Sequence, residues 1–367
     1  MRLLILIAAL ALIAVVLWDG FETIVLPRSV SRRLRLARLY FRAAWTIWSG
    51  AGRRFRSEGD RERFLAVFGP LSLLGLLLVW AVGLIVGFAA LHWSAGSPLV
   101  THDGVRATFI DDLYMSGTTF FTLGLGDLYP LAGSSRFLTV AEAGTGFGFL
   151  AVAIAYLPVL YQSFSRREAR LTLLDAWAGS PPAGAEILRR LAGAGDIAAL
   201  QPFLKEWEYW SSEVLESHIS YPMVAFFRSQ HQRQSWVSAL TSILDVCALV
   251  IVGIEGVPAW QARVTFAIAR HAAVDLSQIL GARPDRRTDR LSPDDLRRLR
   301  DQLGDLGLRV RATPEADGQL ADIRRSYEPY VCGLSRVLMA PLPAWMHEEH
   351  VRDNWQTSPK REGGAHL

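Results

Sequence analysis

Cysteine is scarce in this chain of 367 residues: only Cys247 and Cys332 occur. Two distant cysteines supply neither a disulfide framework nor the paired spacing of a metal site. The sequence also lacks a Gly-x-Gly-x-x-Gly motif after a predicted strand and the succession of short strands that a cyclic-nucleotide-binding roll requires. No nucleophile, metal cluster or acid–base pair indicates an enzyme. The net charge of +4 comes without a recognisable nucleic-acid-binding module, so no nucleic-acid partner is expected.

Long uncharged runs are what the chain has in abundance, in keeping with its hydrophobic content of 51%. Residues 64–91 contain no charge and are long enough to cross about 30 Å of hydrocarbon. Residues 137–164 contain one charged residue, Glu142, and end at the basic sequence 165–167. Residues 1–18 are apolar but for one arginine and lack the signals of a cleaved leader, so we expect a retained anchor. The sequence therefore predicts three membrane crossings.

Between the second and third apolar runs lies a stretch of nearly bare backbone, Thr-Leu-Gly-Leu-Gly-Asp at 122–127. Gly124 and Gly126 occupy alternate positions, where glycine lets successive carbonyl oxygens turn toward one axis and replace the water around an ion. Thr122 can add its hydroxyl as a further ligand, and Asp127 would close the outer end and favour cations there. The pattern is typical of an ion-selectivity filter.

Residues 107–121 are amphipathic and too short to span, as expected of a pore helix whose C-terminal dipole end points toward a cation. The run 116–136, followed by an apolar helix, resembles the pore domain of the tetrameric potassium channel family, and the likeness covers residues 64–165. Because a carbonyl ring needs four strands and the chain has one such stretch, the resemblance implies a homotetramer. It also implies permeant K⁺ and no other cofactor, with coordinating oxygens from Thr122, Leu123, Gly124, Leu125 and Gly126.

The stretch departs from the family pattern in two places. The usual filter reads Thr-Val-Gly-Tyr-Gly, whereas Leu125 stands here at the position of the tyrosine. The family's carboxylate within the pore helix is also missing, because Gly117, Thr118 and Thr119 fill that part of the sequence. Two alternatives to a potassium channel stay open: a nonselective cation channel, and a non-conducting membrane sensor or scaffold with a vestigial pore loop.

The third apolar run carries the candidates for gating and for the cavity. Gly146 falls where the family places the hinge of its inner helix, and Gly144 and Gly148 flank it. Close helix packing explains these glycines equally well. Glu142 could line the cavity below the filter and concentrate cations there, or it could pack behind the pore helix with hydrogen bonds to Thr118 or Thr119.

Charge asymmetry predicts the topology in the cell membrane. Residues 28–63 carry eleven arginines against three acids, which indicates a cytoplasmic loop by the positive-inside rule. Residues 92–136 carry two arginines against four aspartates, which suits the outer face. We therefore expect the N-terminus outside and the C-terminal domain in the cytoplasm. Within the basic loop, residues 34–48 are predicted to form an amphipathic helix on anionic membrane lipid, with topology-fixing charge as the alternative.

We expect an all-α membrane protein with a helix–pore loop–helix channel domain, an extra N-terminal transmembrane helix and a helical cytoplasmic C-terminal domain. Ser292 and Pro293 mark a helix start in that last domain, and residues 237–254 fit a buried helix better than a fourth crossing. No motif identifies a cytoplasmic regulator. The expected divisions are 1–27 for the N-terminal anchor, 28–63 for the basic loop, 64–165 for the pore domain, 166–352 for the cytoplasmic domain and 353–367 for a disordered tail.

Three groups of titratable residues are expected to be ordinary surface groups, with proton, divalent-ion or metal sensing as the alternative in each case. The first group lies near the predicted outer mouth, the second on a predicted helix face and the third near the end of the chain. Their members are His92, His102, Asp111 and Asp112; Glu206, Glu208, Glu213, Glu216 and His218; and His347, Glu348, Glu349 and His350.

Overall fold

The computed structural model is helical, with a single pair of short strands among the residues that it describes. It divides into two compact units, Met1–Tyr161 and Gln162–Leu367. This helical architecture agrees with the expected fold class, a helical membrane protein. The described residues are 1–26, 35–97, 99–101, 107–231, 233–347 and 353–354.

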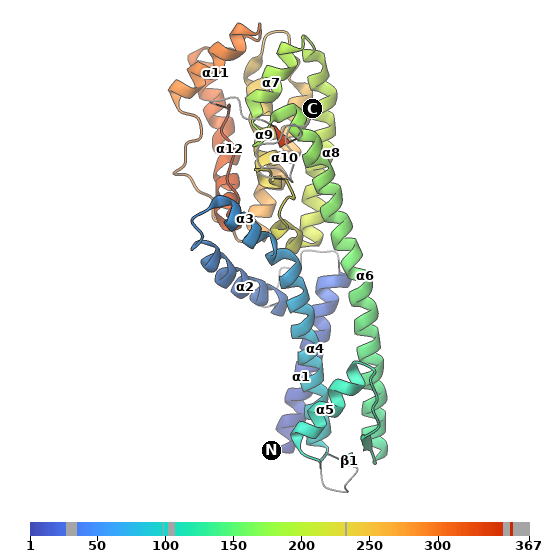
Figure 1. Ribbon diagram of the computed structural model, residues 1–367. Coiled ribbons are helices and arrows are strands. Elements are labelled where there is room, and N and C mark those ends of the chain that lie inside the picture. Colours follow the sequence, from blue (N-terminus) through green and yellow to red (C-terminus); the bar gives the residue numbers. More distant parts are fainter. Residues whose placement is uncertain (27–34, 98, 102–106, 232, 348–352, 355–367) are drawn as a thin grey trace. The chain divides into compact units, whose positions relative to one another are not determined.

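Two long apolar helices lie side by side in the first unit, α1 (Arg2–Gly20, extended by a π-helical turn over Phe21–Val25) and α4 (Phe68–Ser94) (Figure 1). Gly87 of α4 allows the close approach, since a Cβ there would lie only 2.5 Å from Cγ1 of Ile13. Small residues serve this purpose in membrane helix pairs. The N-terminal helix is therefore packed onto the outer helix of the hairpin and does not stand apart from it.

Asp19 joins these two helices to a third. Its carboxylate, buried near the end of α1, accepts hydrogen bonds from the indole N–H of Trp80 (2.9 Å) and the backbone N–H of Ala37 (3.0 Å). Ala37 lies in the first turn of α2 (Leu36–Gly52), whose amide groups have no partner within the helix. Asp19 thus caps α2 from a distance and fixes its start against α1 and α4.

Helix α2 covers most of the stretch predicted to be an amphipathic helix. It is followed by α3 (Glu58–Ala66), which begins where Ser57 accepts a hydrogen bond from the backbone N–H of Asp60 (3.4 Å). The indole ring of Trp48 stacks on the ring of Phe64 with centroids 4.5 Å apart. This contact holds α2 against α3.

The segment between α4 and the next long helix folds back on itself. The short strands β1 and β2 pair in antiparallel fashion, with Val100 opposite Tyr129. The short helix between them starts at a capping box in which the side chain of Thr108 and that of Asp111 each bond the other's backbone N–H. The order is therefore helix, strand, half-length helix, extended loop, strand, helix. The elements are β1 (Leu99–Thr101), α5 (Phe109–Phe120), β2 (Leu128–Pro130) and α6 (Gly133–Ala178).

Helix α6 continues past the basic sequence at 165–167, which ends its apolar run, and stops at Ala178. It runs unbroken for 46 residues and passes through the boundary between the two units. Arg167, which belongs to that basic sequence, is buried in the second unit, where its guanidinium donates to the backbone oxygens of Val224 (2.9 Å) and Phe227 (2.7 Å). An arginine with carbonyl partners can be buried at the start of a protein domain, which the sequence pattern does not reveal.

The second unit is a helical bundle, as expected for the C-terminal domain. Ser292 caps its helix as predicted, accepting from the backbone N–H of Asp295 (3.1 Å), and Pro293 occupies the first helical position. The helices of this unit are α7 (Gly184–Gly193), a 3₁₀ turn at Ile197–Ala199, α8 (Leu200–Ser220), a 3₁₀ turn at Pro222–Phe226, α9 (Trp236–Gly253), α10 (Trp260–Ile279), α11 (Pro293–Asp305) and α12 (Pro314–Leu338).

Helix α9 forms the centre of this bundle. It is one of four described helices that are long and apolar enough to cross a membrane, yet 89% of its residues are buried inside the protein. It also contains a buried acid, Asp245, which accepts two hydrogen bonds from the guanidinium of Arg290 (2.6 and 3.0 Å) and one from the hydroxyl of Tyr327 (2.5 Å). A helix covered on all sides by its own unit presents no face to lipid.

Two surface expectations for the second unit are wrong in part. His218 is not on an exposed face with its neighbouring glutamates but is buried, because it projects from the apolar side of α8. Asp353, placed in the expected tail, pairs with Arg190 at 2.8 Å and is buried. Residues 348–350 and 355–367 lie outside the described residues, so the remainder of the cluster at 347–350 and of the tail stays a prediction.

Candidate functional site

The pore helix α5 leads directly into the Thr-Leu-Gly-Leu-Gly stretch. The backbone N–H of Thr122 donates to the carbonyl of Thr119 (3.0 Å), and that of Leu123 donates to the carbonyl of Thr118 (2.7 Å). These bonds satisfy carbonyl groups that the last turn of a helix leaves free. The start of the stretch is therefore tied to the end of the helix, and any shift of α5 moves both.

The backbone of this stretch adopts a left-handed conformation at every second residue. Thr122, Gly124 and Gly126 have φ angles of +59°, +55° and +78°, whereas Leu123 and Leu125 do not have positive φ. Left-handed conformations at every second residue turn successive carbonyls toward the same side, which is the geometry that the spacing of the two glycines predicts. Among the described residues, none donates a backbone hydrogen bond to the carbonyls of residues 122–126, and the stretch is exposed in the single chain.

Asp127 ends the stretch beside the pore helix. Its Oδ1 accepts from the backbone N–H of Leu128 (3.1 Å), and the hydroxyl of Tyr114 bonds its carboxylate. That bond to a carboxylate raises the pKa of the Tyr114 hydroxyl, with smaller contributions from burial and from the charge itself. Tyr114 thus ties the outer end of the stretch to α5, a role that no sequence motif had indicated.

Gly146 lies where the inner helix passes closest to the pore helix. A Cβ at this position would collide with the carbonyl oxygen of Phe120, the last residue of α5. Gly144 and Gly148 have nothing within 4 Å of the position a Cβ would take. Of the two explanations for these glycines, the structure supports close packing at Gly146, and it gives no such reason for its neighbours.

Glu142 lies on the same face of α6, one turn before Gly146. It is fully buried behind the pore helix, where Oε1 is hydrogen-bonded to the hydroxyl of Ser116. This position agrees with the packing alternative, although the partner is Ser116 and neither Thr118 nor Thr119. Because the side chain has no exposed surface, it does not line an open cavity in this structure.

Two residues expected at the surface of the outer mouth are buried instead. His92, in the last turn of α4, faces the carboxylate of Glu142 at 3.8 Å. Asp112, near the start of α5, accepts a hydrogen bond from the hydroxyl of Ser97 (2.6 Å). Burial raises the pKa of Asp112 to about 6, against the lowering effect of the Ser97 bond. Asp111 is part of the capping box, and His102 lies outside the described residues.

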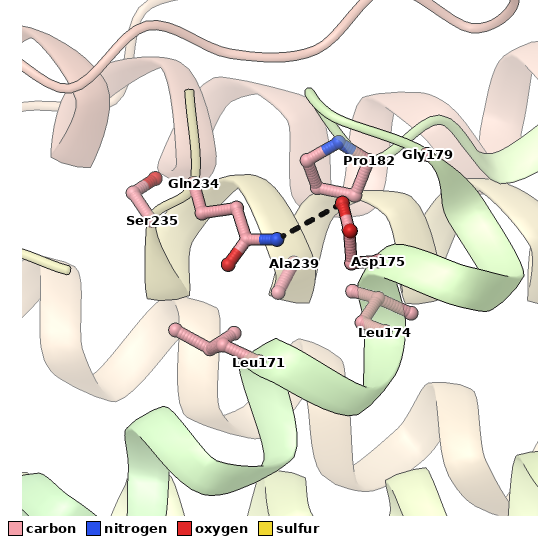
Figure 2. A pocket seen from close by; sticks show the side chains of 8 residues that line it. All are labelled: Leu171, Leu174, Asp175, Gly179, Pro182, Gln234, Ser235 and Ala239. Atoms are coloured by element: carbon pink, nitrogen blue, oxygen red, sulfur yellow. Dashed lines mark hydrogen bonds between the residues drawn. The ribbon is translucent and has the colours of Figure 1, made fainter. Parts of the chain in front are cut away.

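A narrow crevice lies in the second unit. It is closed on one side by a hydrogen bond from the amide of Gln234 to Asp175 (3.3 Å), and it has no room for a water molecule (Figure 2). No group of histidine, cysteine or acidic residues suited to a metal ion occurs among the described residues. The crevice is lined by Leu171, Leu174, Asp175, Gly179, Pro182, Gln234, Ser235 and Ala239.

Comparison with known proteins agrees with this geometry. Residues 75–162 match the model of a family described as ion channel. The match begins within the outer helix and runs through α5 and the extended stretch into α6. Residues 75–162 are therefore similar to an ion-channel domain, and they have the order helix, loop, helix.

A second comparison concerns a larger part of the chain. An uncharacterized membrane protein of Bacillus subtilis, YdjJ, is 27% identical over 206 residues, which are 55% of this chain and 58% of that protein. The chain thus covers less than two thirds of this relative. No solved structure matches. The relative supports the assignment of the chain to a membrane and adds nothing on the ion.

Proposed function

We propose that the protein is a potassium-selective channel in which four copies surround one pore and K⁺ moves passively down its gradient. The observation that carries the proposal is the alternating backbone of Thr122–Gly126, whose carbonyls accept no backbone hydrogen bond from the described residues. Carbonyl oxygens without such partners can take the place of the hydration shell of a cation. In this proposal the coordinating oxygens belong to Thr122, Leu123, Gly124, Leu125 and Gly126, with Asp127 at the outer mouth.

The requirement for four copies follows from the number of ligands. One chain supplies one strand of carbonyls, while a closed ring around an ion needs several related by rotation. The exposed side of α6 supports such an assembly, because apolar residues recur on it at intervals of seven and so fall on nearly the same face of the helix. These exposed residues are Val140, Phe147, Ile154 and Tyr161.

The direction of insertion is proposed from charge. The basic loop at 28–63 would be cytoplasmic, the N-terminus and Asp127 outside, and the second unit in the cytoplasm. The burial of α9 supports the placement of the whole second unit on one side of the membrane, because a helix enclosed by protein does not need to cross the bilayer. Exposed Leu39 and Ile47 on α2, with the exposed Arg42, suit a helix that lies on anionic lipid headgroups.

Uptake of ⁸⁶Rb⁺ or K⁺ into proteoliposomes tests the proposal. The variant Gly124→Ala should lose most of the flux, because its left-handed φ strains any residue with a Cβ. Gly117→Ala is the matched control, since Gly117 lies near the end of α5 with helical backbone and open space around its Cβ position, and this variant should retain the flux. Equal flux in Gly124→Ala and the wild type would show that the stretch does not line the conduction path.

A nonselective cation channel is the second candidate, and Leu125 is the observation that favours it. The aromatic residue that braces the usual filter of the family is replaced here by an exposed leucine. Similar permeability for Na⁺ and K⁺ would select this candidate over the first.

A further inference from the structure

A buried polar cluster joins the three helices of the pore where an apolar contact would suffice. Glu142 of α6, Ser116 of α5 and His92 of α4 have no exposed surface. Each belongs to a different helix. Ionisable residues at membrane depth are costly and are retained when they bind a partner or act in the mechanism. The cluster therefore calls for a functional explanation.

The contacts within the cluster converge on the pore helix. The Ser116 hydroxyl is hydrogen-bonded to Glu142 Oε1 and lies 3.0 Å from the carbonyl oxygen of Ile85 in α4. On the far side, Nδ1 of His92 is 3.3 Å from the hydroxyl of Ser135 in α6. Ser116 is thus held from both neighbouring helices, while His92 is anchored to the inner helix.

The remaining polar atoms of the cluster face each other. Nε2 of His92 and Oε2 of Glu142 have no hydrogen-bond partner and lie 3.8 Å apart. Burying a polar atom without a hydrogen bond costs free energy. Each of these two atoms offsets part of that cost for the other. Removing either side chain leaves the other without its partner, so the cluster behaves as one unit.

The cluster acts at the start of a short mechanical path to the ion ligands. Thr118 lies two residues after Ser116, and its carbonyl accepts a hydrogen bond from the backbone N–H of Leu123 (2.7 Å). One turn along both helices, Gly146 packs on the carbonyl of Phe120. Two contacts of α6, at Glu142 and Gly146, therefore meet α5 one turn apart and set the position of the helix end from which the filter begins.

We propose that Glu142 is a positioning residue for the filter: held by Ser116 and facing His92, it fixes the pore helix and so keeps residues 122–126 in the conducting geometry. The inference rests on the proposed function, and it assigns to the inner helix the support that a carboxylate within the pore helix would otherwise give. Glu142 does not touch the ion, and it acts through α5.

Hydrogen exchange of peptides that contain residues 121–126 tests this role without requiring conduction. In the purified full-length protein, Glu142→Leu and Ser116→Ala should each accelerate exchange at Leu123 and Gly124 about tenfold, the factor expected for loss of one buried hydrogen bond. The double variant should add little to either, because the two side chains form one interaction. Thr139→Val is the matched control, because its hydroxyl bonds only the Ser135 carbonyl of its own helix (2.9 Å).

Permeability provides the readout that a merely structural role would not change. Glu142→Leu should lower the K⁺/Na⁺ permeability ratio about tenfold, and Glu142→Gln, which can still accept the Ser116 bond, should restore most of it. Wild-type exchange in both Glu142→Leu and Ser116→Ala would overturn the inference. If Glu142→Leu does not assemble, Ser116→Ala decides the question by exchange alone. A wild-type protein that passes no K⁺ would instead refute the proposed function, while the exchange result still judges Glu142.

Discussion

At the scale of single residues, the structure gives each of two buried positions on the side of α6 that faces α5 a definite partner. Gly146 meets the backbone of Phe120, and Glu142 meets the hydroxyl of Ser116. The sequence placed both residues on the inner helix and left two explanations open for each. The sequence alone could not decide between these explanations, because they depend on which side of α6 faces α5. Apolar residues occur all around the helix and do not mark that side.

Gly146→Ala should therefore destabilise the protein, whereas Gly144→Ala should not. The added methyl group at 146 overpacks a contact with backbone, which costs about 1–3 kcal/mol. At 144 there is open space within the chain, and alanine in a helix gains about 0.5–1 kcal/mol over glycine. Thermal unfolding of both variants in detergent measures the difference. Equal midpoints would contradict the packing explanation and favour a hinge.

His218 makes the stability of the second unit depend on pH. Burial, followed by the nearby Arg167 charge, lowers the pKa of His218 well below 6.5, against the raising effect of its bond to the Val214 carbonyl. The unfolded chain therefore binds the proton first as the pH falls, and the stabilising effect of a neutral His218 is complete only above pH 6.5. Below that value, the free energy of unfolding should fall by up to about 1.4 kcal/mol per pH unit.

Unfolding by denaturant at pH 7 and pH 5 measures this dependence in the full chain. His218→Gln should flatten it. His271→Gln is the matched control, because His271 lies on the exposed side of α10 beside Asp275, and it should keep the wild-type slope. A slope that is unchanged in His218→Gln would show that another group controls the effect.

At the scale of elements, the apolar runs and helix starts of the sequence predicted most of the helices. Two features of these helices were not predicted, because they depend on contacts between distant segments. The burial of Arg167 depends on carbonyls more than fifty residues away, and Asp19 is paired with Trp80, sixty-one residues later. An acid at the end of an apolar run looks like an interfacial residue unless its donor is known.

Asp19→Ala should loosen α2 and weaken the first unit. The substitution removes one acceptor from two buried N–H groups, those of Trp80 and Ala37, for a cost of about 2 kcal/mol. Hydrogen exchange in the first turn of α2 and thermal unfolding should both report the loss. Glu58→Ala, at an exposed acid of α3, is the control and should leave both values unchanged. Slow exchange in α2 of the Asp19 variant would mean that lipid or other contacts hold this helix.

At the scale of the whole molecule, the sequence predicted a helical membrane protein with a pore loop; the helical membrane fold is confirmed, and the match of residues 75–162 to an ion-channel family agrees with the pore loop. The filter could be located because glycine at alternate positions has a direct backbone meaning. The buried cluster could not be predicted, because His92, Ser116 and Glu142 are far apart in the chain and none belongs to a motif.

The most direct test of the central claim is the reversal potential of the purified protein in a planar bilayer with K⁺ on one side and an equal concentration of Na⁺ on the other. A ring of carbonyls from residues 122–126 in a four-copy assembly that replaces the hydration of K⁺ predicts a reversal potential far from zero, negative on the K⁺ side, because K⁺ crosses much more readily than Na⁺. A reversal potential near zero, with current carried equally by both ions, would contradict the claim.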